Sequence, residues 1–131
     1  MNLTIGDAAS RSGVPAKTIR YYEQIGLIQP AQRGANQYRS YSEEDVAMLR
    51  FVGRARRLGF SVQELKQLVA LYRDRGRASA DVKAIATQHI ARIDRKMAEL
   101  KTVRAALADL SERCHGDARP DCPILDELAA E

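Results

Sequence analysis

The 131-residue sequence predicts a mainly α-helical protein. It is expected to combine a winged helix-turn-helix domain, a long dimerisation helix in an antiparallel coiled coil, and a C-terminal loop with a short helix. Three observations predict this plan: closely spaced helix breaks near the N-terminus, a Pro- and Gly-free stretch over residues 79–112, and two cysteines just after it. The predicted boundaries are residues 1–75, 76–112 and 113–131.

Residues 4–26 are typical of a helix-turn-helix unit. Thr4 and Asp7 form the pattern of a capping box, and Ser12-Gly13 ends the helix that follows. Pro15 suits the start of a second helix, because its missing N–H costs nothing in the first turn. That helix, AKTIRYYEQIG, ends at Gly26. Two short helices around a glycine-containing turn are therefore predicted.

A β-hairpin, or wing, and two further helices are expected next. The stretch LIQPAQRGANQYRSY has Pro and Gly breaks followed by alternating residues, which indicates a hairpin. Ser42 precedes a third helix with acidic residues in its first turn. Ser61 and Glu64 form a capping box for a fourth helix, SVQELKQLVALYRDR. The apolar positions of both helices recur at helical spacing and predict one shared core.

The long stretch after residue 78 predicts a helix that pairs with another helix. Its apolar residues recur at spacings of three, four and seven, in a stripe too narrow to cover a globular core. A helix of this length is about 50 Å long. A second copy of the chain would bury the stripe in a two-fold dimer. The pattern alone allows an antiparallel or a parallel pair. The alternative is that the helix folds back on its own domain. The stripe comprises Val82, Ile85, Ile93, Met97, Leu100, Val103, Leu107 and Leu110.

Charge and the N-terminal residues indicate a cytoplasmic protein with a polyanionic partner. The chain has 21 Lys and Arg against 17 Asp and Glu, a net charge of +4. The N-terminal residues show no secretory signal, and no apolar run is long enough for a membrane span. No nucleophile, base and orienting group stand at compatible spacings, so an enzyme is not expected.

The second helix and the hairpin carry candidate DNA-contacting residues. Lys17, Arg20 and Tyr21 fall on one face of the second helix, whereas Ile19 and Tyr22 can pack inward. Basic side chains neutralise phosphates and read guanine, and tyrosine adds an apolar body with a hydroxyl donor. The hairpin adds Arg33, Tyr38 and Arg39. Arg54, Arg56 and Arg57 extend the basic surface along the third helix.

The segment CHGDARPDC contains both cysteines of the chain, Cys114 and Cys122. Their spacing does not fit CxxC redox chemistry, and zinc normally takes four ligands. His115 is a candidate third ligand, but its position directly after Cys114 argues against it. Thiolates select Cu(I), an ion that two nearly collinear sulfurs can satisfy. Gly116 and Pro120 would let the loop reverse. A pair of free, reduced thiols remains the alternative from spacing alone.

Two further features of the sequence relate to the proposed metal site: the apolar residues after Cys122, and Ser79 at the start of the long helix. Pro123 and the apolar Ile124, Leu125 and Leu128 follow the second cysteine and are expected to cover the site against water and competing ligands. Ser79 opens the long helix, where it would offer a hydrogen bond without adding a third sulfur; an ordinary helix cap is the alternative for this serine.

These residues together resemble the MerR family of transcription regulators. "IRYYEQIGL" and "YRSY" carry the likeness in the N-terminal domain, and "CHGDARPDCPIL" and "ASADVKA" are similar to the copper-responsive, CueR-type branch. The divalent-metal sensors of the family have Cys where this chain has Ser79. The resemblance implies metal ligation by Cys114 and Cys122, and DNA contacts from the second-helix and hairpin residues named above.

The expected function is a Cu(I)-sensing activator, with Ag(I) or Au(I) as alternative ions. The resemblance implies a homodimer that distorts a long promoter spacer when metal binds, so that RNA polymerase engages both promoter hexamers and transcribes copper-resistance genes. A thiol redox regulator that uses a Cys114–Cys122 disulfide is a second hypothesis. A helical interaction module without DNA binding is a third.

Overall fold

The computed structural model describes residues 3–33 and 39–131. The chain divides into two compact units, Met1–Ile85 and Ala86–Glu131. The division falls inside a helix, because Ile85 belongs to the hydrophobic core of the first unit. The functional boundaries predicted at residues 75 and 112 stay predictions.

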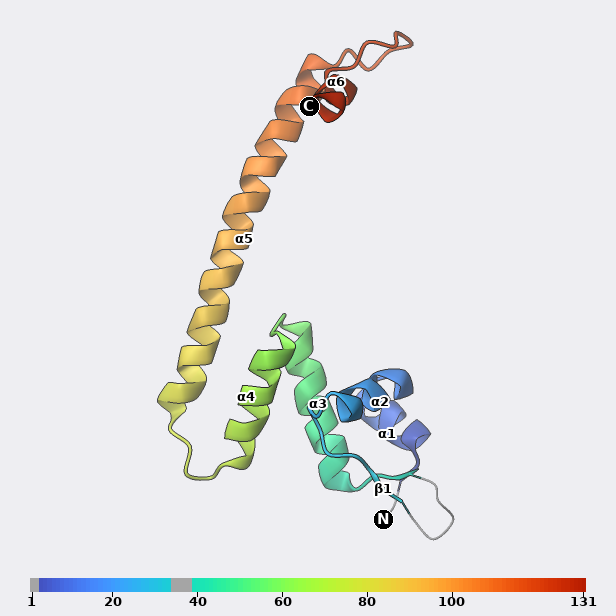
Figure 1. Cartoon of the computed structure of the whole chain (residues 1–131), viewed down its shortest axis with the longest axis vertical. Coiled ribbons are helices and arrows are strands. Elements are labelled where there is room, and N and C mark those ends of the chain that lie inside the picture. The colour runs from blue at the N-terminus through green and yellow to red at the C-terminus, as the bar shows by residue number, and fades with distance from the viewer. Residues whose placement is uncertain (1–2, 34–38) are drawn as a thin grey trace. The chain divides into compact units, whose positions relative to one another are not determined.

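The first unit begins with the predicted helix-turn-helix (Figure 1). Helix α1 spans Ile5–Ser12, and Thr4 and Asp7 form its capping box. Gly13 follows with φ of 78°, a conformation that glycine adopts without a steric penalty. Helix α2 spans Ala16–Gln24, and Pro15 is the residue immediately before it. The sequence prediction for this unit is confirmed, with the second helix ending two residues before Gly26.

A two-stranded antiparallel sheet follows α2. Strands β1, Gln32–Arg33, and β2, Arg39–Ser40, pair Gln32 with Ser40 and Arg33 with Arg39. This pairing confirms the predicted hairpin at its base. Leu3 forms a further antiparallel bridge to Tyr41 and so joins the N-terminal segment to the end of β2.

Helices α3, Glu43–Arg57, and α4, Val62–Arg73, complete the first unit. Ser42 with Asp45 and Ser61 with Glu64 form capping boxes at their N-termini. Helix α3 packs against α1 and α4, and the core has fully buried side chains from α2, α3 and α4, including Ile19, Leu49 and Leu65. The helical spacing also predicts an inward-facing Tyr72 near the end of α4, but this residue is 50% exposed. Its ring packs against Phe51, with ring centroids 4.6 Å apart and ring planes tilted by 31°.

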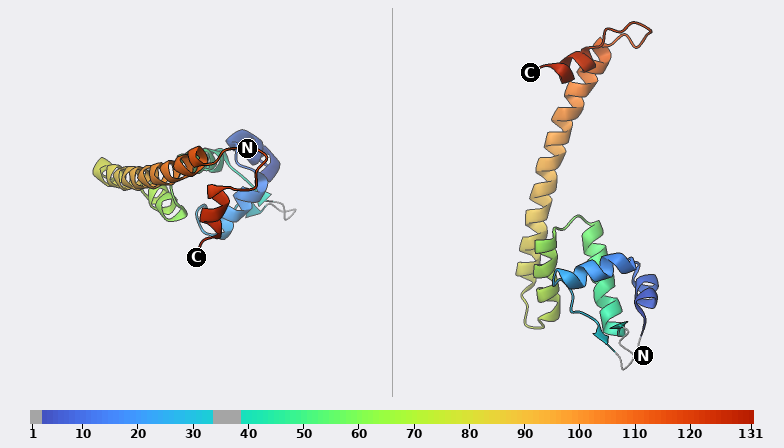
Figure 2. Two further views of the ribbon diagram at one scale, coloured as in Figure 1. Left: turned by 90° about the horizontal axis from the view of Figure 1, so that it is seen from above. Right: turned by 45° about the vertical axis from the view of Figure 1, so that its right-hand side comes forward.

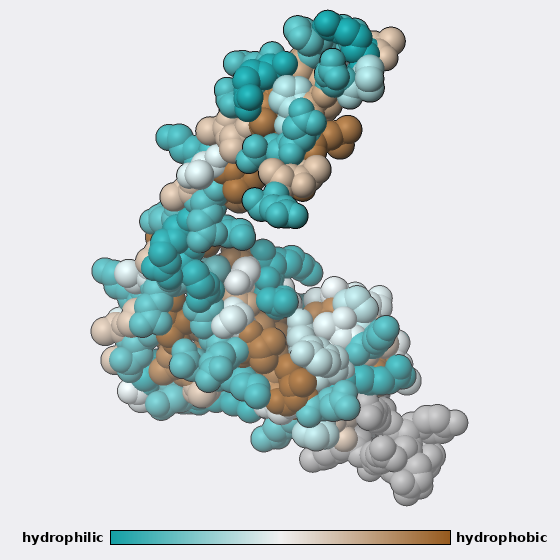
Figure 3. Space-filling model, turned by 45° about the horizontal axis from the view of Figure 1, so that its top comes forward, coloured by the Kyte–Doolittle hydropathy of each residue, from teal (hydrophilic) through white to brown (hydrophobic). Residues whose placement is uncertain are grey.

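Helix α5 spans Ser79–Arg113 as one element of 35 residues and confirms the predicted long helix. Its first turns belong to the first unit, where Val82 and Ile85 pack on the core. Further along, five stripe residues are 42–63% exposed: Ile93, Met97, Leu100, Val103 and Leu107. Figure 3 shows apolar side chains among the hydrophilic surface of this part of the chain.

The second unit ends in helix α6, Pro123–Ala129, which lies beside the last turns of α5 (Figure 2). Leu110, near the end of α5, is 8% exposed and is the most enclosed apolar side chain described in this unit. Among the described residues, no helix is both long enough and apolar enough to cross a membrane.

Candidate metal centre and nucleic-acid interface

The exposed face of α2 carries three of the predicted DNA-contacting residues. Lys17 and Arg20 are exposed, and Tyr21 is 49% exposed. On the opposite face, Ile19 and Tyr22 are buried in the core, as the sequence predicts. Burial of these two side chains orients the helix, so Lys17, Arg20 and Tyr21 form one polar surface that can meet phosphate or base edges.

The hairpin places the backbone of two predicted residues opposite each other. Arg33 in β1 pairs with Arg39 in β2. The side chains of both arginines, and Tyr38 as a whole, lie outside the described part of the structure.

The basic residues near the end of α3 are exposed, and one of them also caps the following turn. Arg56 donates from Nη1 to the Phe60 carbonyl oxygen at 3.1 Å. Arg54 and Arg57 are exposed on the same helix. These charges extend the basic surface of the first unit, as predicted.

An ion pair joins α1 to the start of α3 on the surface. Arg11 donates from Nη1 and Nη2 to the two carboxylate oxygens of Glu43, at 2.7 and 2.6 Å. The Arg11 guanidinium holds the pKa of the Glu43 carboxyl below its usual value. Because this charge is matched within the chain, Arg11 contributes less to the net basic surface than its type suggests.

A buried polar pair in the first unit could not be identified from the sequence. The Tyr41 hydroxyl donates to Glu23 Oε1 at 2.6 Å, and the two residues are 1% and 8% exposed. Glu23 stands four positions after Ile19, on the inner face of α2. A charged residue at a position that the helical period assigns to the core was the signal available in the sequence.

The two cysteines lie together at the base of the loop between α5 and α6. Their sulfur atoms are 3.8 Å apart, and both side chains are half-buried. Cys114 directly follows α5, and its N–H donates to the Ser111 carbonyl oxygen at 3.2 Å. Cys122 is the residue before α6, with Pro123 as the first helical residue. The two helix ends thus bring together thiols that the sequence separates by seven residues.

The start of α6 favours the thiolate form of Cys122. The Leu125 backbone N–H lowers the pKa of the Cys122 thiol more than any other group does. Hydrogen bonds from the Cys114 thiol and the Ile124 N–H lower this pKa as well, whereas partial burial and the Asp126 carboxylate raise it. The net effect is a pKa below the ordinary value, which suits a metal ligand because thiolates are the ligating form.

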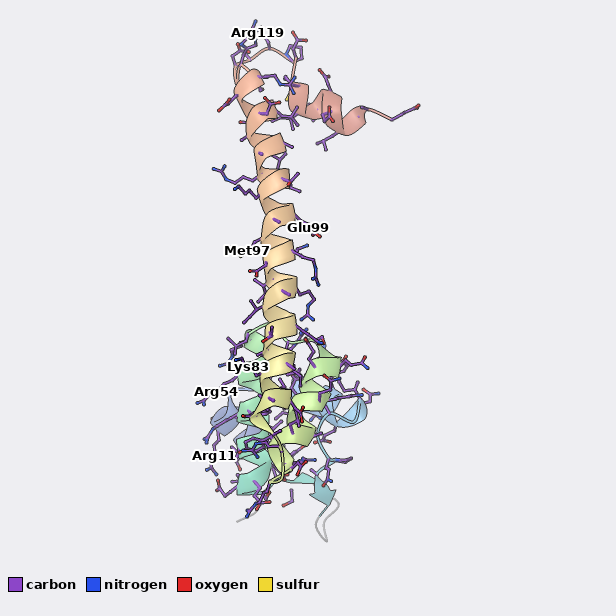
Figure 4. All side chains as sticks on the ribbon, turned by 90° about the vertical axis from the view of Figure 1, so that its left-hand side faces the viewer. Arg11, Arg54, Lys83, Met97, Glu99 and Arg119 are labelled. Atoms are coloured by element: carbon purple, nitrogen blue, oxygen red, sulfur yellow. The ribbon has the colours of Figure 1, made fainter. Side chains whose placement is uncertain are left out.

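The loop reverses through a structured tip. Gly116 has φ of 67°, which confirms its predicted part in the reversal. Asp117 accepts hydrogen bonds from the Arg119 backbone N–H at 2.9 Å and from Arg119 Nε at 2.9 and 3.2 Å. Figure 4 shows Arg119 at the end of the second unit.

The sulfur separation does not by itself select a coordination number, because 3.8 Å is also about the edge of a tetrahedral site with bonds of about 2.3 Å. Two collinear bonds of about 2.3 Å, the length of a zinc–thiolate bond, span about 4.6 Å, so the thiols need to separate by less than about 1 Å. Within residues 3–33 and 39–131, no group of three or more His, Cys, Asp or Glu residues is arranged to hold a metal ion.

The predicted apolar cover of the loop is not formed within one chain. Ile124 is half-buried, but Leu125 and Leu128 are 63% and 74% exposed. These two leucines are three positions apart on one face of α6 and point to solvent, so their prediction as a lid is wrong for the single chain.

Ser79 is the first residue of α5 rather than the residue before it, and its side chain is exposed. It belongs to the first unit, whereas both cysteines belong to the second. Its predicted part in supporting the metal site stays a prediction.

Comparison with known proteins identifies the family. Residues 3–71 match the family described as "MerR HTH family regulatory protein", and residues 46–110 match "MerR, DNA binding". The transcriptional regulator HmrR of Sinorhizobium medicae is 57% identical over 127 residues, which is 97% of this chain and 86% of that protein. The regulator CueR of Salmonella typhimurium is 40% identical over 127 residues, 97% of this chain and 92% of that protein.

A solved structure agrees with the sequence relatives. The lead(II) complex of the regulator PbrR691 from Ralstonia metallidurans matches with a TM-score of 0.84 at 30% identity, over 97% of this chain and 99% of that chain. The relatives are named as transcriptional regulators, which agrees with the prediction that the chain is not an enzyme. The chain therefore belongs to the MerR family of DNA-binding, helix-turn-helix transcription regulators.

Proposed function

We propose that this protein is a cytoplasmic, Cu(I)-sensing transcription activator in which Cys114 and Cys122 hold the ion. The observation that carries the proposal is the pair of free thiols 3.8 Å apart at the base of one loop. Soft thiolates favour Cu(I), and Ag(I) and Au(I) are plausible substitutes with the same preference. A metal-responsive function is supported by 57% identity over 127 residues to a protein of Rhizobium meliloti named heavy metal-dependent transcription regulator 2.

Each part of the chain has a place in this proposal. Lys17, Arg20 and Tyr21 contact promoter DNA from α2, and Arg33, Tyr38 and Arg39 contact it from the hairpin. The exposed stripe of α5 pairs with a second copy, so that the homodimer meets both halves of a two-fold promoter element. Ser79 supports the metal site at the start of α5.

Bound metal would supply the signal, because a ligand that binds one protein state more tightly shifts the population toward that state. The dimer in that state bends and untwists the promoter spacer, and RNA polymerase then engages both hexamers at copper-resistance genes. Bending and untwisting the spacer costs a deformation energy that depends on the DNA sequence.

An anaerobic Cu(I) titration of the purified protein, against a competing chelator, tests the site. We expect Cys114→Ser and Cys122→Ser each to lose tight binding, because one thiolate cannot form the two-coordinate site. His115→Ala is the matched control: it removes the neighbouring imidazole and should leave Cu(I) binding unchanged. Unchanged binding in both serine variants would exclude this site, and loss of binding in His115→Ala would indicate a third ligand.

The distance between the thiols also favours one other function, a redox switch. A peroxide could take two electrons and two protons from the pair, giving a Cys114–Cys122 disulfide and water. The sulfurs would have to approach from 3.8 Å to about 2.05 Å. The switch predicts peroxide-driven transcription without copper, with the disulfide visible by mass spectrometry. Free thiols during full peroxide-driven activation would reject it.

A further inference from the structure

The hydrogen bond between Tyr41 and Glu23 joins two parts of the DNA-binding domain that are 18 residues apart in sequence. Glu23 lies in the last turn of α2, and Tyr41 directly follows strand β2. The donor and acceptor atoms are 2.6 Å apart and the residues are 1% and 8% exposed, so the bond is largely shielded from solvent and its loss is costly.

The backbone of Tyr41 is also held in place. Its N–H donates to the Leu3 carbonyl oxygen at 2.8 Å, and its carbonyl oxygen accepts from the Leu3 N–H at 2.9 Å. The next residue, Ser42, caps α3. Tyr41 therefore has a fixed main chain at the point where the hairpin joins the helical core, and its side chain reaches from there to α2.

A hydrogen bond to a carboxylate fixes distance and direction, which an apolar contact does not. Burying a carboxylate is costly unless its oxygens are hydrogen-bonded, and a well-packed apolar pair would often be at least as stable. Charge-assisted hydrogen bonds are short and strongly directional. The pair thus specifies the position of α2 relative to β2 in a way that core packing alone does not require.

We infer that Glu23 and Tyr41 are positioning residues that hold α2 at a fixed position relative to the β1–β2 hairpin, so that both meet the same DNA duplex. Neither residue needs to touch DNA. The inference rests on the proposed DNA contacts from α2 and the hairpin. Without the bond, one of the two surfaces should no longer reach its phosphates while the other still does.

Tyr41→Phe tests this inference, because it removes the donor hydroxyl and keeps the ring. The probe is a short duplex selected by the wild-type protein from a random-sequence pool. We expect the affinity of Tyr41→Phe for this duplex to fall about tenfold or more. The dependence of log K on log salt should become shallower by about 1 for each DNA phosphate that the variant no longer neutralises.

Glu23→Gln is the conservative control. Its amide oxygen still accepts from Tyr41, so affinity should stay within a factor of about three of wild type and the salt dependence should be unchanged. A merely structural role predicts a different pattern: thermal stability falls in Tyr41→Phe, but the folded fraction binds with the wild-type salt dependence. That pattern overturns the inference.

The double variant Tyr41→Phe, Glu23→Gln covers the case in which Tyr41→Phe does not fold. It removes the hydrogen bond and replaces the carboxyl group with a neutral amide, and the same shallower salt dependence is expected. An unchanged salt dependence in the folded double variant overturns the inference while leaving the proposed function intact. Failure of the wild-type protein to select any duplex overturns both.

Discussion

Single residues determine the chemistry of the loop, and Cys122 shows how. Its thiol faces the first backbone N–H groups of α6, which lower its pKa. A thiol with a lowered pKa keeps its thiolate to lower pH. Any stability that this thiolate adds to the fold is present above its ordinary pKa and is lost as pH falls through the lowered value.

Alkylation of Cys122 in the Cys114→Ser variant should therefore reach half of its maximal rate at a lower pH in the folded protein than in urea. The serine hydroxyl can still donate to the Cys122 sulfur, so the local hydrogen bonds are largely kept. Iodoacetamide labelling followed by mass spectrometry over a pH series measures this midpoint. The same variant unfolded in urea is the control, and an equal or higher midpoint in the folded state would contradict the prediction.

The residue scale is also where the sequence was least informative. The cysteines could be recognised as a pair, but their 3.8 Å separation depends on where α5 ends and α6 begins. The helical period placed Glu23 on the inner face of α2, but its partner Tyr41 could not be predicted, because the tertiary fold brings together residues 18 positions apart.

At the scale of elements, helix starts were predictable because their signals are local. Thr4, Ser42 and Ser61 each cap a helix together with an acidic residue three positions later. A capping box depends on four consecutive residues, so sequence alone is sufficient to find it. Packing between elements could not be predicted from the sequence. An example is Gly53 in α3, where an added Cβ would lie 3.0 Å from Val14 Cγ2.

Gly53→Ala should consequently lower the free energy of unfolding by about 1 kcal/mol, because crowding of the buried Val14 outweighs the better helix propensity of alanine. Gly6→Ala is the matched control in α1, where a Cβ would have only Thr4 Oγ1 at 3.7 Å nearby. Alanine is the better helix former, so this change should raise the free energy of unfolding by up to about 1 kcal/mol. Urea denaturation measures both values, and equal effects of the two substitutions would argue against close packing at Gly53.

At the scale of the whole molecule, α5 presents apolar side chains that one chain leaves uncovered. Met97, Leu100 and Val103 are 63%, 56% and 53% exposed on successive turns. Figure 4 shows Met97 and the charged Glu99 projecting to different sides of this helix. The periodicity of the sequence predicted this stripe, because residues at spacings of three and four share a helix face.

Leu100→Asp should convert the proposed dimer into a monomer, since it places a charge in the paired surface. Thr102→Asp is the matched control: it introduces the same side chain at an exposed position that is not three or four residues from any of the exposed stripe residues, and it should leave a dimer. Light scattering coupled to size-exclusion chromatography gives the mass of each variant. A dimer in both would show that the stripe does not form the interface.

The closure of the cysteine loop at its base has a consequence for protein engineering. The thiols meet where the two helices end, and the Asp117–Arg119 pair organises the tip through its own hydrogen bonds. The tip residues are exposed, and exposed loop tips are where proteins best tolerate replacement and insertion. Changes in the length and composition of the segment between the cysteines should therefore be tolerated by the fold. If the proposed function holds, such changes would alter the metal site and leave the DNA-binding domain as it is.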